Sequence, residues 1–167
     1  MKIRLAGLTN DSIVDGTGLR LTVFVQGCPH RCPGCHNPQT HDFHGGYDGD
    51  TDQIMKMVEE NILLDGVTLS GGEPFAQPEP CTDIAQKVHA AGLNVWCYTG
   101  YLFEELMASD HRKRALLEHI DVLVDGPFQL EKRTLEARFR GSSNQRILDV
   151  PQSIKMGKAV LMTFDPA

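Results

Sequence analysis

Residues 19–35 read Leu19-Arg-Leu-Thr-Val-Phe-Val-Gln-Gly-Cys28-Pro-His-Arg-Cys32-Pro-Gly-Cys35. The first seven residues are rich in β-branched and aromatic side chains, which predicts a strand that ends at Gly27. Three cysteines follow at once in the pattern C-x3-C-x2-C. The sequence therefore predicts a short, cysteine-bearing loop at the C-terminal end of a strand.

The spacing of these cysteines is typical of a metal-binding loop. Thiolates are soft ligands that suit both iron–sulfur clusters and zinc. A [4Fe-4S] cluster needs one ligand per iron, so three cysteines would leave one iron open to a small molecule. A histidine could instead close a zinc site, and His30, His36 and His41 are all nearby in the sequence. The loop alone leaves both interpretations open.

Size and composition narrow the class of protein. The chain has 167 residues, near the prior of about 150 for one domain, so we expect a single domain over residues 1–167. The formal charge is −6, and no run of basic residues is long enough to bind along a phosphate backbone, which argues against nucleic acid as a partner.

The sequence contains no signal peptide and no apolar run of membrane-spanning length, so we expect a cytosolic protein without a membrane partner. The five cysteines do not resemble a secreted disulfide framework, and we expect Cys81 and Cys97 in the core.

Strand and helix patterns alternate along the chain, which predicts an α/β fold with parallel strands joined by right-handed crossovers. A complete eight-unit barrel needs about 250 residues, so we predict a partial (β/α) barrel of five to six parallel strands. The expected strands are 19–25, 66–70, 93–98, 120–124, 146–150 and 158–164. The expected helices are 51–62, 81–88, 102–108, 111–119 and a short one that begins at Pro151. We expect Asp50 to cap the start of the first helix and Gly92 to end the second.

Polar and glycine-rich motifs follow the C-terminal ends of these strands, where parallel α/β folds build their sites. Gly71 and Gly72 could let a ligand lie against the backbone, and Glu73 could orient a cationic group such as an ammonium; the alternative is a tight turn with a solvated carboxylate. Asp125 could accept hydrogen bonds from ribose hydroxyls or an amino group, or serve as an ordinary turn residue. We also expect Asp15 to pair with Arg20.

Together these motifs resemble the radical S-adenosylmethionine (SAM) enzymes, with the cysteine loop and the double-glycine turn in the expected order. The resemblance extends to the glycyl-radical-enzyme activases of that superfamily. Within the activases, the short chain is similar to the group that acts on anaerobic ribonucleoside-triphosphate reductase. The motifs that carry this likeness are Ser12-Ile-Val-Asp-Gly-Thr-Gly-Leu-Arg20, Val25-Gln-Gly-Cys28, Cys35-His-Asn-Pro38, Tyr98-Thr-Gly-Tyr101, Val124-Asp-Gly-Pro-Phe128 and Arg140-Gly-Ser-Ser-Asn-Gln-Arg146.

The resemblance implies an oxidoreductase of radical SAM type. Cys28, Cys32 and Cys35 would hold a [4Fe-4S] cluster whose open iron binds SAM. An electron from a flavodoxin- or ferredoxin-like donor would lead to cleavage of SAM into methionine and a 5′-deoxyadenosyl radical. That radical would take a hydrogen atom from a glycine Cα of anaerobic ribonucleoside-triphosphate reductase and leave a glycyl radical there.

The resemblance also implies which residues contact SAM. The pyruvate formate-lyase activase has a Lys two residues after the Asp that aligns with Asp125, whereas Pro127 stands here, so the SAM carboxylate needs another partner. Alternatives are an activase of another glycyl radical enzyme such as pyruvate formate-lyase, a radical enzyme for a small molecule, or a structural zinc module. The residues expected at SAM are His36, Asn37, Gly71, Gly72, Glu73, Asp125 and Arg146.

Overall fold

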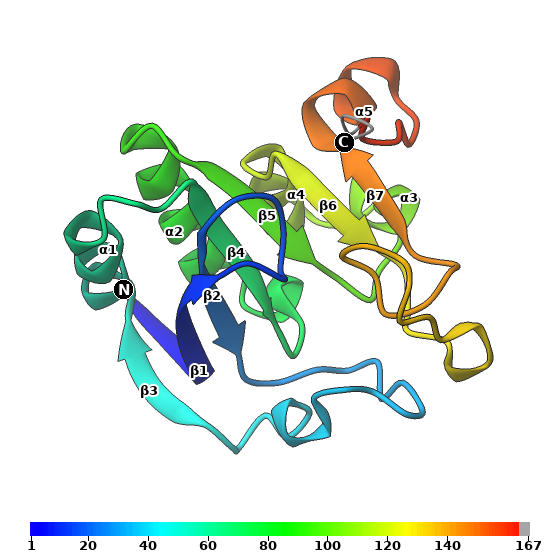
Figure 1. The fold of residues 1–167 in the computed structure, drawn as a ribbon, viewed down its shortest axis with the longest axis horizontal. Helices are drawn as coiled ribbons and strands as arrows, with labels where there is room; N and C mark the ends of the chain where they lie inside the picture. Colours follow the sequence, from blue (N-terminus) through cyan, green and yellow to red (C-terminus); the bar gives the residue numbers. More distant parts are fainter. Residues whose placement is uncertain (164–167) are drawn as a thin grey trace.

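The computed structural model describes residues 1–163 and contains one seven-stranded sheet in the order β3-β1-β2-β4-β5-β6-β7 (Figure 1). The strands are β1 Lys2–Ser12, β2 Arg20–Val25, β3 Tyr47–Asp50, β4 Gly66–Gly71, β5 Asn94–Tyr98, β6 Val122–Asp125 and β7 Arg146–Asp149. The helices are α1 Thr51–Glu60, α2 Pro78–Ala90, α3 Phe103–Met107, α4 His111–Glu118 and α5 Val150–Met156. Short 3-10 turns lie at Pro38–Thr40, Pro74–Ala76 and Leu130–Lys132.

The centre of the sheet agrees with the prediction, but its edges do not. Strands β2, β4, β5 and β6 pair in parallel, whereas β1 pairs antiparallel with both β2 and β3, and β7 pairs antiparallel with β6. The prediction of five to six parallel strands is therefore wrong in number, since the sheet is mixed and open with four parallel strands at its centre. Strands β1 and β3 were not predicted, because β1 has little alternation and Tyr47-Asp-Gly-Asp50 is polar.

Several predicted elements shift at their ends. Helix α1 begins after its predicted cap, because the side chain of Asp50 accepts a hydrogen bond from the Asp52 amide, but it stops at Glu60 instead of 62. The predicted strand 158–164 is reduced to an isolated bridge between Leu148 and Leu161, and its last residue, Phe164, lies outside the described residues. Among residues 1–163, no helix has both the length and the apolar character needed to cross a membrane.

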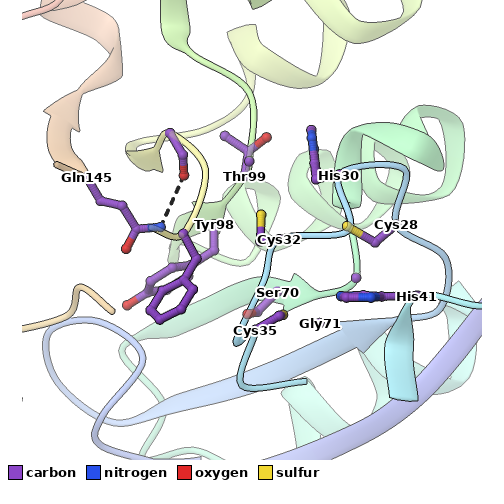
Figure 2. Close-up of a pocket in the computed structure, with 14 residues that line it drawn as sticks. Cys28, His30, Cys32, Cys35, His41, Ser70, Gly71, Tyr98, Thr99 and Gln145 are labelled. Atoms are coloured by element: carbon purple, nitrogen blue, oxygen red, sulfur yellow. Dashed lines mark hydrogen bonds between the residues drawn. The ribbon is translucent and has the colours of Figure 1, made fainter. Parts of the chain in front are cut away.

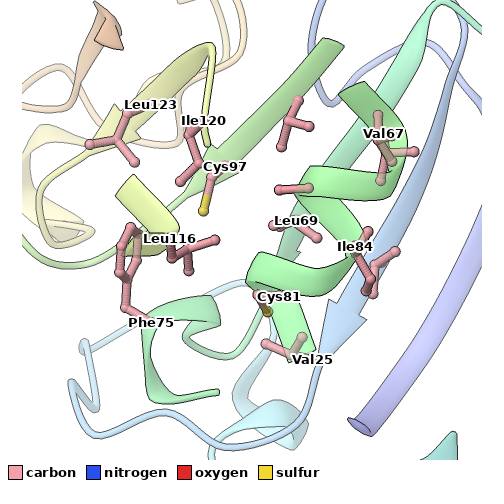
Figure 3. Packing of buried hydrophobic residues seen from close by; sticks show 14 of the residues in the cluster. Val25, Val67, Leu69, Phe75, Cys81, Ile84, Cys97, Leu116, Ile120 and Leu123 are labelled. Atoms are coloured by element: carbon pink, nitrogen blue, oxygen red, sulfur yellow. The ribbon is translucent and has the colours of Figure 1, made fainter. Parts of the chain in front are cut away.

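The two faces of the sheet are buried in different ways. Helices α1, α2 and α4 cover one face (Figure 1), and Val67, Leu69, Val95 and Cys97 point into the main hydrophobic core there (Figure 3). Because successive side chains of a strand alternate between faces, Trp96 points the other way and joins a smaller cluster with residues of β6. One face therefore supplies most of the apolar core, and the other is left for polar and aromatic groups.

Buried polar groups at this second face include Arg20, which was expected to pair with Asp15. Within residues 1–163 no ion pair joins the two; instead the Thr68 hydroxyl accepts from Arg20 Nε at 2.7 Å and donates to the Asp15 carbonyl at 2.7 Å. The Asp15 carboxylate accepts from the hydroxyls of Ser12 and Thr22 at 2.9 and 3.0 Å. The expected pairing is therefore replaced by a link through a threonine of β4.

The long connection between β2 and β3 carries the cysteines, and hydrogen bonds close its base. Gln26 donates through its amide side chain to the carbonyls of Gln39 and Asp42, at 3.0 and 2.7 Å. The amides of Gly27 and Cys28 donate to the carbonyls of Thr40 and His41. Residues 28–41 thus form a loop that is tied to the sheet at both of its ends.

Candidate functional site

A pocket lies at the C-terminal ends of the parallel strands, where the sequence placed its unusual motifs. It is lined by the cysteine loop, by the residues that end β4 and β5, and by the segment after β6. Figure 2 shows Tyr98 and Gln145 across this pocket from Cys28. Three cysteine side chains and the double-glycine turn are therefore neighbours in space: Cys28, Cys32, Cys35, Gly71 and Gly72.

The cysteine side chains lining this pocket are partly buried. Burial raises the pKa of the Cys28 and Cys32 thiols above the ordinary value for cysteine. Across residues 1–163, no three His, Cys, Asp or Glu side chains converge closely enough to hold a single metal ion. A four-iron cluster takes one ligand per iron, so its cysteines stand farther apart than the ligands of one zinc ion. Three thiols around one pocket are donors of the kind that an iron–sulfur cluster takes.

The histidines that could have closed a zinc site have other neighbours. His30 Nε2 lies 2.6 Å from the Glu73 carboxylate, and the His36 ring packs at 5.1 Å from the ring of Phe128. His41 lines the pocket, but it is not part of any cluster of three metal-binding side chains among the described residues. The pocket therefore offers soft sulfur donors, and of the three histidines His30 and His41 also line it, His30 with its ring against Glu73.

Close packing of the backbone explains why glycines occupy positions 71 and 72. Gly71 has a φ of +99°, and a Cβ there would lie 2.5 Å from the Val25 backbone nitrogen. At Gly72 a Cβ would lie 2.4 Å from the carbonyl oxygen of Gly27. The missing side chains therefore allow the end of β4 to pack against the strand that leads into the cysteine loop, while the turn itself still lines the pocket.

Glu73, expected at a ligand's ammonium, does not line the pocket itself but lies behind residues that do: His30, Thr99 and Gly100. Its side chain is fully buried, and its carboxylate accepts hydrogen bonds from the Thr99 hydroxyl, the Gly100 amide and the Phe75 amide at 2.8 to 3.0 Å. The same carboxylate contacts His30. With these partners, its oxygens are occupied inside the protein.

Asp125 and Arg146, both expected at SAM, contact each other in this structure. Arg146 donates from Nε and Nη2 to the two oxygens of the buried Asp125 carboxylate, at 3.0 and 2.5 Å, and also binds Glu104. Asp125 accepts a further hydrogen bond from the Phe103 amide at 2.8 Å. Hydrogen bonds to Asp125 and Glu104 raise the pKa of Arg146 above its ordinary value. In this structure the pair ties β6 and β7 to helix α3, and neither residue lines the pocket.

Replacing Arg146 by glutamine is expected to lower the free energy of unfolding by about 3 kcal/mol, because it leaves a buried carboxylate without its cation. Urea denaturation followed by circular dichroism measures this. The matched control is Arg112→Gln, which removes an ion pair with Glu79 whose two side chains are 53% and 52% exposed. That control should change stability by less than about 1 kcal/mol. Equal effects of the two substitutions would contradict a structural role for Arg146.

His36 and Asn37 line a second pocket that adjoins the first. The second pocket is bounded on its far side by residues 14–15 and 139–141, and the two pockets share five residues: Cys35, Ser70, Tyr98, Phe128 and Gln145. The structure therefore brings these two expected residues near the cysteines, but next to the pocket with the double glycine and not inside it.

Several residues that line the pocket stood in motifs that the sequence analysis quoted, but they were not expected to contact SAM. Tyr98 is the last residue of β5 and Thr99 follows it, and burial raises the pKa of the Tyr98 phenol. Gln145 donates through its side-chain amide to the Gly126 carbonyl at 3.1 Å (Figure 2). The signal available for Tyr98 and Thr99 was their place at the end of a predicted strand. Gln145 could not be found in this way, because it precedes a strand that runs in the opposite direction.

Comparison with known proteins agrees with this site. A family profile described as a 4Fe-4S single cluster domain matches residues 14–148. The anaerobic ribonucleoside-triphosphate reductase-activating protein of Salmonella typhimurium is 37% identical over 147 residues, which cover 80% of this chain and 90% of that protein. The protein of the same name from Haemophilus influenzae is 37% identical over 143 residues, covering 81% and 90%. The one from Enterobacteria phage T4 is 30% identical over 141 residues, covering 80% and 86%.

A solved structure shares the fold. The crystal structure of QueE from Escherichia coli has a TM-score of 0.50 over 60% of this chain and 53% of that chain, with 15% sequence identity. At this identity the likeness concerns the fold alone. The family profile and the relatives, in contrast, each cover most of the chain, and the description of the profile agrees with a loop that carries an iron–sulfur cluster. The chain therefore belongs to the 4Fe-4S single cluster domain family and, with these relatives, to the anaerobic ribonucleoside-triphosphate reductase-activating proteins.

Proposed function

We propose that this protein is a radical SAM activating enzyme that installs a glycyl radical on anaerobic ribonucleoside-triphosphate reductase. The observation that carries the proposal is the meeting of Cys28, Cys32 and Cys35 with the Gly71–Gly72 turn around one pocket. The names of the relatives support the reductase as the partner. The proposed cofactors are a [4Fe-4S] cluster and SAM, and the proposed electron donor is a flavodoxin- or ferredoxin-like protein.

The cluster, when bound with one iron open, supplies the electron that cleaves SAM and so generates the 5′-deoxyadenosyl radical. The chain's part is to bind and to orient. The three cysteine thiolates hold the cluster, each on one iron. Because the amides of Gly72 and Glu73 already donate to the carbonyls of Val25 and Gly27, carbonyl oxygens are what the turn can present to a ligand. Such oxygens accept hydrogen bonds from an ammonium group, as the amino end of SAM requires.

Aromatic side chains on the pocket wall are suited to contact the parts of SAM other than its amino end. Tyr98, the last residue of β5, and Phe128, in the segment after β6, both line the pocket. Apolar walls exclude water from a reactive radical and limit its side reactions. The adjoining pocket, which His36 and Asn37 line, gives the ligand a second surface within reach of Cys35. We assign these two residues to the cofactor side of the site.

The test is an anaerobic assay of the whole chain. After reconstitution with iron and sulfide and reduction, addition of SAM should yield 5′-deoxyadenosine and methionine in equal amounts. Addition of the reductase should then produce a glycyl radical signal in electron paramagnetic resonance (EPR) spectra. Protein with a loaded cluster that cleaves no SAM would overturn the proposal. A glycyl radical on pyruvate formate-lyase but not on the reductase would keep the chemistry and change the partner.

A further inference from the structure

We infer that His30 and Glu73 form a positioning pair that fixes the cysteine loop, and above all Cys28, against the rim of the sheet. The inference rests on the proposed function, because it concerns the loop that would hold the cluster. It differs from the expected role of Glu73, since the carboxylate acts here on another part of the protein and not on a ligand. Neither side chain is assigned a chemical step; both act through the cysteine that they hold.

Glu73 holds the chain on both sides of Cys28. Its backbone amide donates to the carbonyl of Gly27 at 2.8 Å, one residue before the cysteine. Its carboxylate lies 2.6 Å from His30 Nε2, two residues after the cysteine. One residue at the end of β4 therefore fixes both the entry and the exit of the Cys28 backbone.

The anchor itself is rigid because it is buried and fully bonded. The Glu73 carboxylate accepts from the Thr99 hydroxyl and the Gly100 amide in the segment after β5, and from the Phe75 amide in its own turn. Its side chain has no exposed surface. Three segments at the ends of β2, β4 and β5 thus meet at one carboxylate, so a movement of the cysteine loop would have to break bonds in the interior.

Packing also fixes the position of the His30 ring next to Glu73. Its ring is edge-on to the ring of Tyr101, with centroids 4.6 Å apart and planes at 77°, and its side chain is only 16% exposed. A Cβ added at Gly100 would lie 2.5 Å from the ring, so the segment after β5 leaves a space that the imidazole fills. The histidine is therefore fixed by shape as well as by its hydrogen bond.

Other restraints on this loop are few. In the part of the chain that the structure describes, the contact of His30 with Glu73 is the only hydrogen bond between two side chains that joins residues 28–36 to the rest of the protein. The Cys35 amide donates to the Cys32 carbonyl, which is a bond within the loop. Pro29 and Pro33 have no amide hydrogen to donate. Residues 32–35 thus form a local turn. The Cys32 thiol hydrogen-bonds with the Phe128 backbone and the His36 ring packs against Phe128, so the contact of His30 with Glu73 acts mainly on the part of the loop around Cys28.

Removing the anchor should loosen the cluster without unfolding the protein. In His30→Ala, iron should leave the reconstituted cluster for an excess of chelator about tenfold faster than in the wild type, the order expected when a residue that orients a metal ligand is lost. His30→Gln should lie within about threefold of the wild type, because its side-chain amide nitrogen can donate to Glu73 from nearly the same place. His44→Ala is the matched control, since this histidine is exposed on the same connection and lines no part of the cysteine pocket.

Two further readouts separate positioning from general damage. The EPR spectrum of the reduced cluster, recorded with and without SAM, should change in His30→Ala and stay as in the wild type in His44→Ala. In the metal-free chain, amide exchange measured by nuclear magnetic resonance should be faster for Cys28 and Gly100, whose amides are hydrogen-bonded here. Wild-type iron release and wild-type exchange in His30→Ala would overturn the pair. A wild-type chain that takes up no cluster would overturn the proposed function instead, and the exchange measurement would still test the pair.

Discussion

Replacement of Cys28, Cys32 or Cys35 by alanine is expected to abolish SAM cleavage, with a loss of more than about a thousandfold in each case. Each cysteine would supply the sole protein ligand of one iron, and the structure offers no fourth cysteine at this pocket among the described residues to take its place. Iron and sulfide bound per chain after reconstitution, the visible absorbance of the cluster and the yield of 5′-deoxyadenosine measure the effect together. Intact cleavage in any one of the three variants would contradict the ligand assignment.

The matched controls for these variants are the two cysteines of the core. Cys81 and Cys97 have no exposed surface and lie among apolar side chains beneath the sheet (Figure 3). Burial raises the pKa of both thiols well above the ordinary value, as expected for cysteines that serve as small apolar residues. Cys81→Ala and Cys97→Ala should therefore keep the cluster and the activity, at a stability cost of about 1 kcal/mol each. Loss of the cluster in either control would show that cysteine replacement acts through the core.

Gly71→Ala is expected to have the largest effect on stability, a loss of about 4 kcal/mol in the free energy of unfolding. A side chain at φ +99° is strained, and its Cβ would lie 2.5 and 2.6 Å from the backbone nitrogen and oxygen of Val25. Backbone atoms of a central strand cannot move aside as the tip of a side chain can. Urea denaturation should show the loss directly, and reconstitution should fail because the cysteine loop starts from the same strand.

Substitutions at two other glycines distinguish the cost of a positive φ from the cost of the clash with β2. Gly92 has a φ of +81° but open space where a Cβ would stand, so Gly92→Ala should cost about 1 kcal/mol through backbone conformation alone. Gly7 has no positive φ and no atom within 4 Å of the added Cβ, so Gly7→Ala should change stability by less than about 1 kcal/mol. A loss at Gly71 no greater than that at Gly92 would refute the clash with β2.

The sequence was a good guide to the centre of the fold. Apolar runs such as Leu19–Val25 and the helical spacing over 51–60 are strong local signals, and the structure contains the predicted elements there. The edge strands were harder to predict. Tyr47–Asp50 is exposed or half-buried along its whole length, so it has no buried face that could leave a pattern in the sequence. The direction of β7 was also not encoded locally, because it depends on how the chain returns from the segment after β6.

The site was predictable where one short segment determines it. The three cysteines and the double glycine could be placed at one rim from strand ends alone. The protein partners of the carboxylates could not be predicted, because they are distant in sequence: Asp125 binds Arg146, 21 residues away, and Glu73 binds His30, 43 residues away. An isolated carboxylate after a strand gives the same local signal whether it faces a ligand or an interior cation. Only the fold decides between the two.

The hydrogen bonds that close the base of the cysteine loop bear on what happens to this loop when oxygen removes the iron. Oxidation that strips iron from such a loop would leave residues 28–41 without their metal, but the bonds from Gln26 and Gly27 that close the loop involve no cysteine. The apolar core lies among the strands and helices, away from these residues. We therefore expect a chain that has lost its cluster in air to keep this scaffold, so that iron, sulfide and reductant should restore the cluster without refolding.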